Sequence, residues 1–174
     1  MKKVLVISDN HRRTELMYAI VDLVKPVDLI VHCGDVEVSH IVQLLSERAD
    51  CPVYVVSGNN DYLGEYPPVE TFMLGEHRVL LTHGHKYRVY SDLTPLYYLA
   101  EQEKADIVLF GHLHIPIIRK DNGILLVNPG SLTYPRQSNG LPSYGMLTLE
   151  DNGEVRAAIR YVKRTGKGLG ILPD

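Results

Sequence analysis

The chain has 174 residues, 45% of them hydrophobic, and a formal net charge of −3 at pH 7. This length predicts one domain over residues 1–174, since domains average about 150 residues, and the negative charge disfavours a protein that wraps nucleic acid. No apolar run approaches the roughly 18 residues of a membrane span, and Cys33 and Cys51 form no disulfide framework, which favours the cytoplasm.

The first half of the chain alternates short apolar runs with amphipathic segments. Residues 4–7, 29–31 and 53–56 are continuous apolar runs, typical of buried parallel strands. Residues 14–24 and 41–45 carry apolar side chains at helical spacing, the first at Leu16, Ala19, Ile20, Leu23 and Val24. This order of strands and helices predicts a parallel sheet with right-handed crossovers.

The second half is richer in strands. Residues 70–74 and 77–82 flank Gly75-Glu76 as in a hairpin, residues 94–103 indicate a helix with Leu96, Leu99 and Ala100 on one face, and residues 106–110 a buried strand. Four more strands are predicted at 115–119, 124–127, 146–149 and 155–162, with Asn-Gly turns at 122–123 and 152–153. The chain therefore favours two packed sheets with outer helices, and residues 163–174, rich in Gly and Lys, are expected to fray.

Five short polar motifs follow predicted strands. They are Asp9-Asn10-His11, Gly34-Asp35, Gly58-Asn59-Asn60-Asp61, His83-Gly84-His85 and Gly111-His112-Leu113-His114. Because strands of α/β sheets place their carboxyl ends together, and ligands bind there, we expect one cleft. Carboxylates and imidazoles suit Mn²⁺, Fe, Ni²⁺ or Zn²⁺. So many ligands exceed one tetrahedral zinc and favour two metals that share a carboxylate.

Each motif also has a purely structural interpretation. Asp9 and Asp35 are residue types that cap helices and turns, and residues 58–61 have the composition of a turn, in which Asp61 would orient a neighbour. Against this, Asp9 and His11 would point to the same side of an extended strand, and a lone core or surface His explains two H-x-H pairs poorly. Three histidines without motif context are assigned structural roles: His32, His40 and His77.

In order and spacing, these motifs resemble the calcineurin-like metallophosphoesterases, above all their small YfcE-type phosphodiesterase branch. Asn128-Pro129-Gly130-Ser131, with Pro135-Arg136 after it, resembles a later motif of that branch, and the resemblance covers roughly residues 1–162. It implies an α/β fold, a four-layer αββα sandwich of two mixed β-sheets flanked by helices. It also implies two divalent metal ions, Mn²⁺ first, with Ni²⁺, Fe²⁺ or Zn²⁺ as alternatives.

The resemblance also implies a role for each ligand residue. Asp9, His11 and His114 would hold one metal, and Asn59, His83 and His112 the other. Asp35 would bridge the two ions.

The chain departs from the family pattern after the ligand Asn59. Many members have His there, which can protonate the leaving group, whereas this chain has Asn60, which cannot be a general acid near neutral pH. Asn60 and His85 are therefore the candidate catalytic residues, with His85 or water as the proton source.

These residues predict a metal-dependent phosphoesterase, most simply a phosphodiesterase. A metal-bridging hydroxide would attack the phosphorus of a small phosphorylated substrate. The alternatives are a phosphomonoesterase or nucleotidase with the same centre, and a non-catalytic Vps29-like scaffold for protein interaction. A nuclease resembling Mre11 is disfavoured by the short chain without basic excess, so stable nucleic-acid binding is not expected, nor is a membrane partner. Small relatives often self-associate, so a homodimer is compatible with the resemblance.

Overall fold

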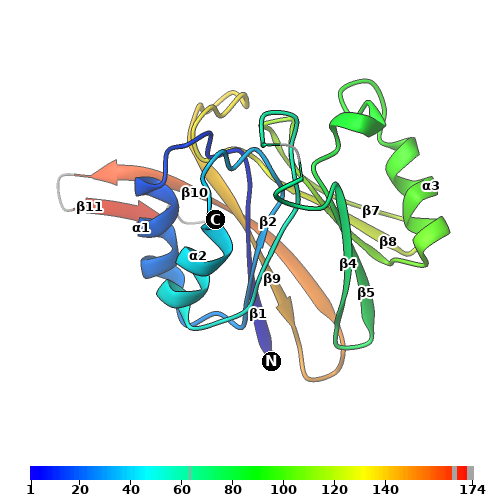
Figure 1. The fold of residues 1–174 in the computed structure, drawn as a ribbon. Coiled ribbons are helices and arrows are strands. Elements are labelled where there is room, and N and C mark those ends of the chain that lie inside the picture. The colour runs from blue at the N-terminus through cyan, green and yellow to red at the C-terminus, as the bar shows by residue number, and fades with distance from the viewer. Residues whose placement is uncertain (63, 166–167, 172–174) are drawn as a thin grey trace.

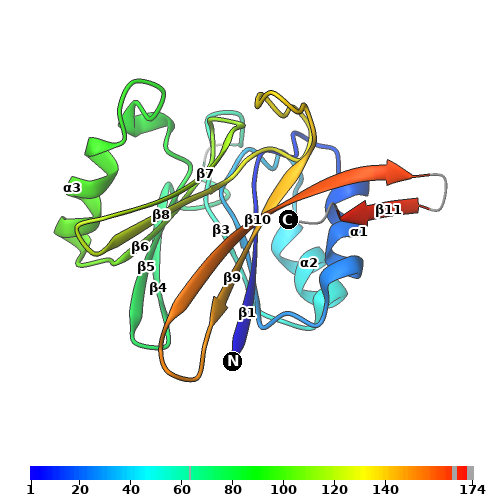
Figure 2. The same ribbon diagram turned by 180° about the vertical axis from the view of Figure 1, so that it is seen from behind.

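In the computed structural model, which describes residues 1–62, 64–165 and 168–171, two β-sheets pack face to face (Figures 1 and 2). The first sheet has the strand order β11-β10-β9-β1-β2-β3. Its strands are β1 (Lys2–Ile7), β2 (Leu29–His32), β3 (Val53–Val55), β9 (Ser143–Leu149), β10 (Val155–Thr165) and β11 (Gly168–Ile171). The second has the order β4-β5-β6-β8-β7. Its strands are β4 (Val69–Leu74), β5 (His77–Thr82), β6 (Ile107–Phe110), β7 (Pro116–Asp121) and β8 (Ile124–Pro129).

Helices cover the outer faces of both sheets. The helices α1 (Glu15–Val24) and α2 (Ile41–Ala49) pack on the first sheet, and α3 (Thr94–Glu103) packs on the second, while a short 3₁₀ helix, η1 (His85–Tyr87), follows β5. The predicted four-layer αββα sandwich is thus confirmed. No helix in the described ranges is long and apolar enough to cross a membrane.

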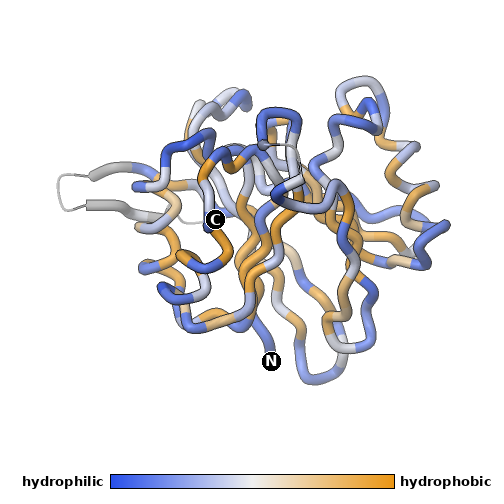
Figure 3. Tube along the Cα trace, in the orientation of Figure 1, coloured by the Kyte–Doolittle hydropathy of each residue, from blue (hydrophilic) through white to orange (hydrophobic). Residues whose placement is uncertain are grey.

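Strand β1 shows how the layers are buried. Val4 and Val6 face the second sheet, where they pack in one cluster with Val79. Leu5 and Ile7 point the opposite way and pack in another cluster with residues of α1 and α2. Successive side chains of a strand alternate between faces, so a strand buried on both sides has a continuous apolar sequence. Figure 3 shows the apolar colour concentrated along the strands.

The strand pairing confirms the predicted combination of parallel and antiparallel segments. Strands β1, β2 and β3 are parallel neighbours, as are β5, β6 and β8. Three hairpins, β4–β5, β7–β8 and β9–β10, are antiparallel. In the turn between β7 and β8, Asn122 and Gly123 have φ values of 48° and 83°, and two positive φ angles are what a two-residue type I′ turn requires.

Helix α1 buries only some of its apolar residues. Met17, Ile20 and Val21 are fully buried, whereas Leu23 is 42% exposed. Apolar residues occur on several sides of this helix, so periodicity alone could not select the stripe. The helix packs against both the first sheet and α2, and this double contact decides which side is buried.

The end of the chain also differs from the expectation of fraying. Residues 163–165 continue β10, and residues 168–171 form β11, which pairs antiparallel with it from Val162↔Ile171 to Thr165↔Gly168. Such pairing uses backbone groups, so a segment rich in Gly and Lys can still extend the sheet. Residues 166–167 and 172–174 of the predicted tail lie outside the described residues.

Candidate metal centre

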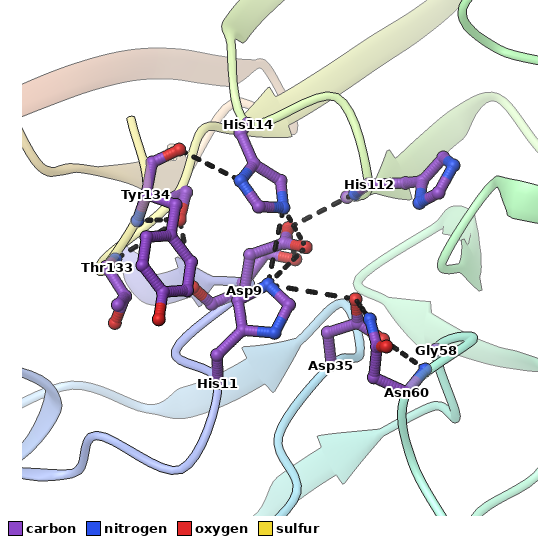
Figure 4. A network of polar contacts seen from close by, with 12 residues as sticks. Asp9, His11, Asp35, Gly58, Asn60, His112, His114, Thr133 and Tyr134 are labelled. Atoms are coloured by element: carbon purple, nitrogen blue, oxygen red, sulfur yellow. Dashed lines mark hydrogen bonds and ion pairs between the residues drawn. The ribbon is translucent and has the colours of Figure 1, made fainter. Parts of the chain in front are cut away.

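The five polar motifs converge at one edge of the two sheets, beyond the carboxyl ends of β1, β2, β3, β5 and β6. Figure 4 shows labelled residues from the motifs that follow β1, β2, β3 and β6. Asp9, His11 and His114 form a first group there. The Nε2 atom of His114 lies 3.0 Å from Oδ1 of Asp9 and 3.3 Å from Nε2 of His11. His11 Nε2 lies 3.8 Å from the same Asp9 oxygen, so three ligand atoms surround one small volume.

Asp9, Asp35 and His83 form a second group beside the first. The Nε2 atom of His83 lies 3.4 Å from Oδ2 of Asp35 and 4.0 Å from Oδ1 of Asp9. Oδ2 of Asp35 is also 3.8 Å from Nε2 of His11. Asp35 therefore lies between His11, which belongs to one predicted ligand set, and His83, which belongs to the other. This is the position that a bridging carboxylate would need. Asp9 shares this central position, which the sequence did not indicate.

The other two predicted ligands border the same site. Asn59 and His112 line a cavity of about 180 Å³ whose other described lining residues are His11, Asp35, Asn60, Tyr90, His114, Tyr134 and Arg136. The His112 ring centroid lies 5.0 Å from that of His83. The structure thus brings all seven predicted ligand residues to one place.

The histidine rings are held with Nε2 toward the centre. In two of them the opposite nitrogen, Nδ1, faces a backbone carbonyl oxygen. Nδ1 of His83 lies 2.7 Å from the carbonyl oxygen of Cys33, and Nδ1 of His114 lies 2.9 Å from that of Tyr134. In His11, Nδ1 lies 2.9 Å from a carboxylate oxygen of Glu37. Each oxygen accepts a hydrogen bond from Nδ1–H, so the proton stays on Nδ1 and the Nε2 lone pair is left for a metal.

Within the part of the chain that the structure describes, Oδ1 of Asp9 and Nε2 of His83 are buried at the centre without a hydrogen-bond partner. Buried polar atoms in proteins are nearly always paired, and Asp is almost never fully buried without a compensating charge. A carboxylate and an imidazole lone pair aimed at the same point fit a divalent cation. The oxygen and nitrogen donors, without a thiolate, suit Mn²⁺, Fe²⁺, Ni²⁺ or Zn²⁺.

Two groups of the centre, Asp35 and His112, have shifted pKa values that favour their metal-binding forms. Burial acts to raise the pKa of Asp35, but the nearby His83 and the two hydrogen bonds from Asn60 outweigh it and lower this pKa. Burial and the nearby His83 lower the pKa of His112 to about 4. At neutral pH, Asp35 is therefore ionised and His112 is neutral, the forms that bind metal.

The backbone is in the left-handed region at five of the seven predicted ligands. Their φ values are 55° at Asp9, 43° at His11, 54° at Asp35, 69° at His112 and 59° at His114. Non-glycine residues rarely adopt this region, and such strain clusters at functional sites. The expectation that Asp9 and His11 lie in an extended strand was wrong, because β1 ends at Ile7. The left-handed backbone brings both side chains to the centre instead.

Glycines permit the close approach of the loops. A Cβ atom on Gly58 would lie 2.1 Å from Oδ1 of Asp35. Gly34 has φ of 96°, and a Cβ there would lie 2.8 Å from Nδ1 of His83. Both positions therefore need glycine.

Asp61 positions the loops, as the turn interpretation suggested. Its carboxylate accepts hydrogen bonds from the backbone N–H groups of Asp35, Val36, Glu37 and Gly58, at 2.7–2.8 Å. The motif at 128–131 has a similar role. The Asn128 amide donates to the carbonyl of Gly111 at 2.7 Å, and the Ser131 hydroxyl donates to the carbonyl of Asp9 at 2.9 Å.

The two candidate catalytic residues lie in different settings. Asn60 donates to both carboxylate oxygens of Asp35, from its backbone N–H at 2.9 Å and its side-chain amide at 2.7 Å. His85 has its ring centroid 5.4 Å from that of His83, and its buried Nδ1 has no hydrogen-bond partner among the residues that the structure describes. It lines a second cavity, of about 240 Å³, that Asn59 also borders.

Three further residues at the mouth were not assigned a role from the sequence: Tyr90, Tyr134 and Arg136. Arg136 belongs to the later motif, but no local pattern marks Tyr90. The structural role predicted for His32 is confirmed, since its Nε2 lies 2.9 Å from Oδ1 of Asn10 and its Nδ1 accepts the N–H of Gly34 at 3.2 Å. Burial lowers the pKa of His32 to about 4.

Comparisons with known proteins show the family of the chain. Residues 1–152 match the model of the calcineurin-like phosphoesterase superfamily domain. The chain is 36% identical over 172 residues to the probable metallophosphoesterase YsnB of Bacillus subtilis, which covers 98% of this chain and 96% of YsnB. It is 30% identical over 114 residues to the phosphodiesterase YfcE of Escherichia coli K12, covering 64% of this chain and 54% of YfcE.

Solved structures share the fold along nearly the whole chain. A predicted phosphoesterase from Streptococcus pneumoniae has a TM-score of 0.79 and 28% identity, with 98% of this chain and 97% of that chain covered. Vps29 of Entamoeba histolytica in complex with zinc has a TM-score of 0.76 at 23% identity, with 98% and 97% covered, a likeness of fold alone. The sequence match, the shared fold and the converging ligand residues agree that the chain belongs to the calcineurin-like phosphoesterase superfamily.

Proposed function

We propose that this protein is a metal-dependent phosphodiesterase. The observation that carries the proposal is the pair of buried carboxylates, Asp9 and Asp35, set between histidines of both sheets. Asp9 Oδ1 and His83 Nε2 lie 4.0 Å apart, and neither has a hydrogen-bond partner among the described residues. We propose that Asp9, His11 and His114 hold one ion, that Asn59, His83 and His112 hold the other, and that Asp35 bridges them. We propose Mn²⁺ first.

The residues of the chain would orient the metal ligands and supply hydrogen bonds for this chemistry. Two bound divalent ions would neutralise phosphate charge and lower the pKa of a coordinated water. Asn60 commits its amide to Asp35 and so orients the carboxylate rather than moving a proton. Glu37 and the carbonyls of Cys33 and Tyr134 fix the imidazole orientations. His85, beside the centre, is the group we propose to hydrogen-bond the leaving-group oxygen, directly or through water.

Two cavities meeting at Asn59 support a diester substrate. One has a volume of about 180 Å³ and contains the ligand residues, and the other has a volume of about 240 Å³ and is lined by His85, Tyr62 and Lys86. A phosphodiester carries a group on each side of phosphorus, and each cavity offers room for one. The relative named phosphodiesterase YfcE points the same way.

Two other functions share parts of this evidence. A phosphomonoesterase or nucleotidase would use the same centre and leave one cavity unfilled. A Vps29-like scaffold would need the fold but no intact ligand set, whereas here every predicted ligand position holds a competent residue. We propose a single-domain cytoplasmic enzyme that acts on a small phosphorylated compound.

Parallel assays separate these functions. Protein loaded with Mn²⁺ is given bis-para-nitrophenyl phosphate and para-nitrophenyl phosphate at equal concentration. Faster cleavage of the diester supports the proposal, and faster cleavage of the monoester supports a phosphomonoesterase. Cleavage of neither, with metal binding confirmed, supports a scaffold.

A further inference from the structure

The cavity at the metal centre is lined, among the described residues, by one positively charged side chain, Arg136, that is not a predicted metal ligand. We propose that Arg136, held in place by Tyr90, binds a phosphate oxygen of the substrate. This inference rests on the proposed function and assigns a substrate-binding residue to the same site.

The loop that carries Arg136 is anchored to the ligand-bearing segments. The backbone N–H of Arg136 donates to the carbonyl of His114 at 3.0 Å. The Thr133 hydroxyl donates to the carbonyl of Asn10 at 2.7 Å, and the N–H groups of Thr133 and Tyr134 donate to the Ser131 hydroxyl. Figure 4 shows Thr133 and Tyr134 beside His11 and His114. These hydrogen bonds therefore hold the backbone of Arg136 in a defined position beside the metal centre.

The side chain of Arg136 is oriented by an aromatic residue from a distant loop. Its Nη1 donates to the Tyr90 hydroxyl, and its guanidinium carbon lies 5.8 Å from the Tyr90 ring centroid. The Tyr90 hydroxyl in turn donates to the carbonyl of His112 at 2.9 Å. A chain of hydrogen bonds thus links the guanidinium to the segment that holds a metal ligand.

The guanidinium of Arg136 contacts Tyr90 but forms no ion pair with a carboxylate within the described part of the chain. Arg12, by contrast, pairs with Glu37 at 2.7 Å. Arg136 is the one Lys or Arg among the described residues that line the cavity containing the ligand residues. A guanidinium presents several N–H donors in a planar fork that matches phosphate oxygens, and the contact with Tyr90 uses Nη1 alone, so donors remain for an anion.

A simpler role for Arg136 is to tie the two loops together. A tether would stabilise the fold and the metal site, and its loss would lower both the melting temperature and the metal content. A phosphate-binding residue would instead change anion affinity while metal content stays constant. The two roles therefore differ in measurable quantities.

The test compares the unmodified protein with the variants Arg136→Gln, Arg136→Lys and Tyr90→Phe. All of these proteins are loaded with Mn²⁺. Arg156→Gln is the control, because Arg156 is an exposed arginine on β10 paired with Glu154. Binding of inorganic phosphate is measured by calorimetry, bound Mn²⁺ by elemental analysis, and KM and kcat with bis-para-nitrophenyl phosphate.

We expect Arg136→Gln to weaken phosphate binding and raise KM by about 10- to 100-fold, as for the loss of a hydrogen bond to a charged group. The value of kcat and the Mn²⁺ content should change little, because the contact is made to bound substrate and transition state alike. Arg136→Lys should recover part of the loss, Tyr90→Phe should show a smaller loss, and the control should behave as the unmodified protein.

Unchanged phosphate affinity and KM in Arg136→Gln would overturn the assignment, as would a loss of affinity that merely follows lost Mn²⁺ or melting temperature. If the unmodified protein cleaves no ester but Arg136→Gln still weakens phosphate binding at constant metal content, the proposed function fails and the anion site stands. Absence of phosphate binding in the unmodified protein would also overturn the assignment.

Discussion

The Nε2 atom of His83 lies 3.4 Å from Oδ2 of Asp35. His83 follows β5 of the second sheet and Asp35 follows β2 of the first, so this contact joins the two halves of the sandwich. A metal pair held here would cross-link the sheets. Ligands that bind only the folded state stabilise it by an amount that grows with the logarithm of their concentration divided by Kd.

The first prediction concerns Asp35. The change Asp35→Asn removes the negative charge from the proposed bridge while keeping its shape. Mn²⁺ affinity and diester hydrolysis should each fall by at least about 100-fold, because even residues outside the coordination sphere are worth 10- to 100-fold. Asp22→Asn, an exposed carboxylate paired with Lys25 and Arg48, is the control. Full activity in Asp35→Asn would refute the bridging role.

A second prediction concerns Asn60. Its amide donates to Asp35 and cannot protonate a leaving group. Asn60→His should accelerate cleavage of diesters with poor leaving groups, such as a dialkyl phosphate that must lose an alkoxide, more than diesters with good ones, such as bis-para-nitrophenyl phosphate. Asn60→Ala controls for the lost amide. The measurement is the ratio of rates for the two leaving groups, and the same ratio in all three proteins would count against proton supply being limiting.

The third prediction concerns pH and His77, far from the metal centre. His77 joins the two sheets, since its Nε2 lies 2.7 Å from the carbonyl of Gly153 and its Nδ1 pairs with Asp106. These contacts raise its pKa above the ordinary value. A group whose pKa is raised on folding stabilises the protein below its unfolded pKa, and this stabilisation is lost as pH rises through the folded pKa.

His77→Gln should therefore cost more stability at pH 5.5 than at pH 9. Urea unfolding of both proteins at the two pH values gives the difference, in which titrations elsewhere cancel. Asp106→Asn should reduce the pH dependence, because it removes the charged partner. A cost that is equal at the two pH values, or larger at pH 9, would show that the ion pair does not form.

Much of this structure could be predicted from the sequence, because its signals are local. Short apolar runs marked the strands, and the residue types after them marked the ligands, since parallel strands bring their ends together. The central position of Asp9 was not predictable, because it depends on left-handed backbone that an alternating strand pattern does not describe. The pairing of Arg136 with Tyr90 joins two loops distant in the chain, and neither loop reveals it alone.

Metal-dependent hydrolysis is tested most directly by returning Mn²⁺ in steps to protein stripped by a chelator. Bound Mn²⁺ per chain and the rate of bis-para-nitrophenyl phosphate cleavage are followed in the same samples. We expect two ions per chain, no cleavage by the stripped protein, and activity that rises as the second ion binds. Cleavage without metal, or two bound ions with no cleavage of the diester, would contradict a dinuclear phosphodiesterase.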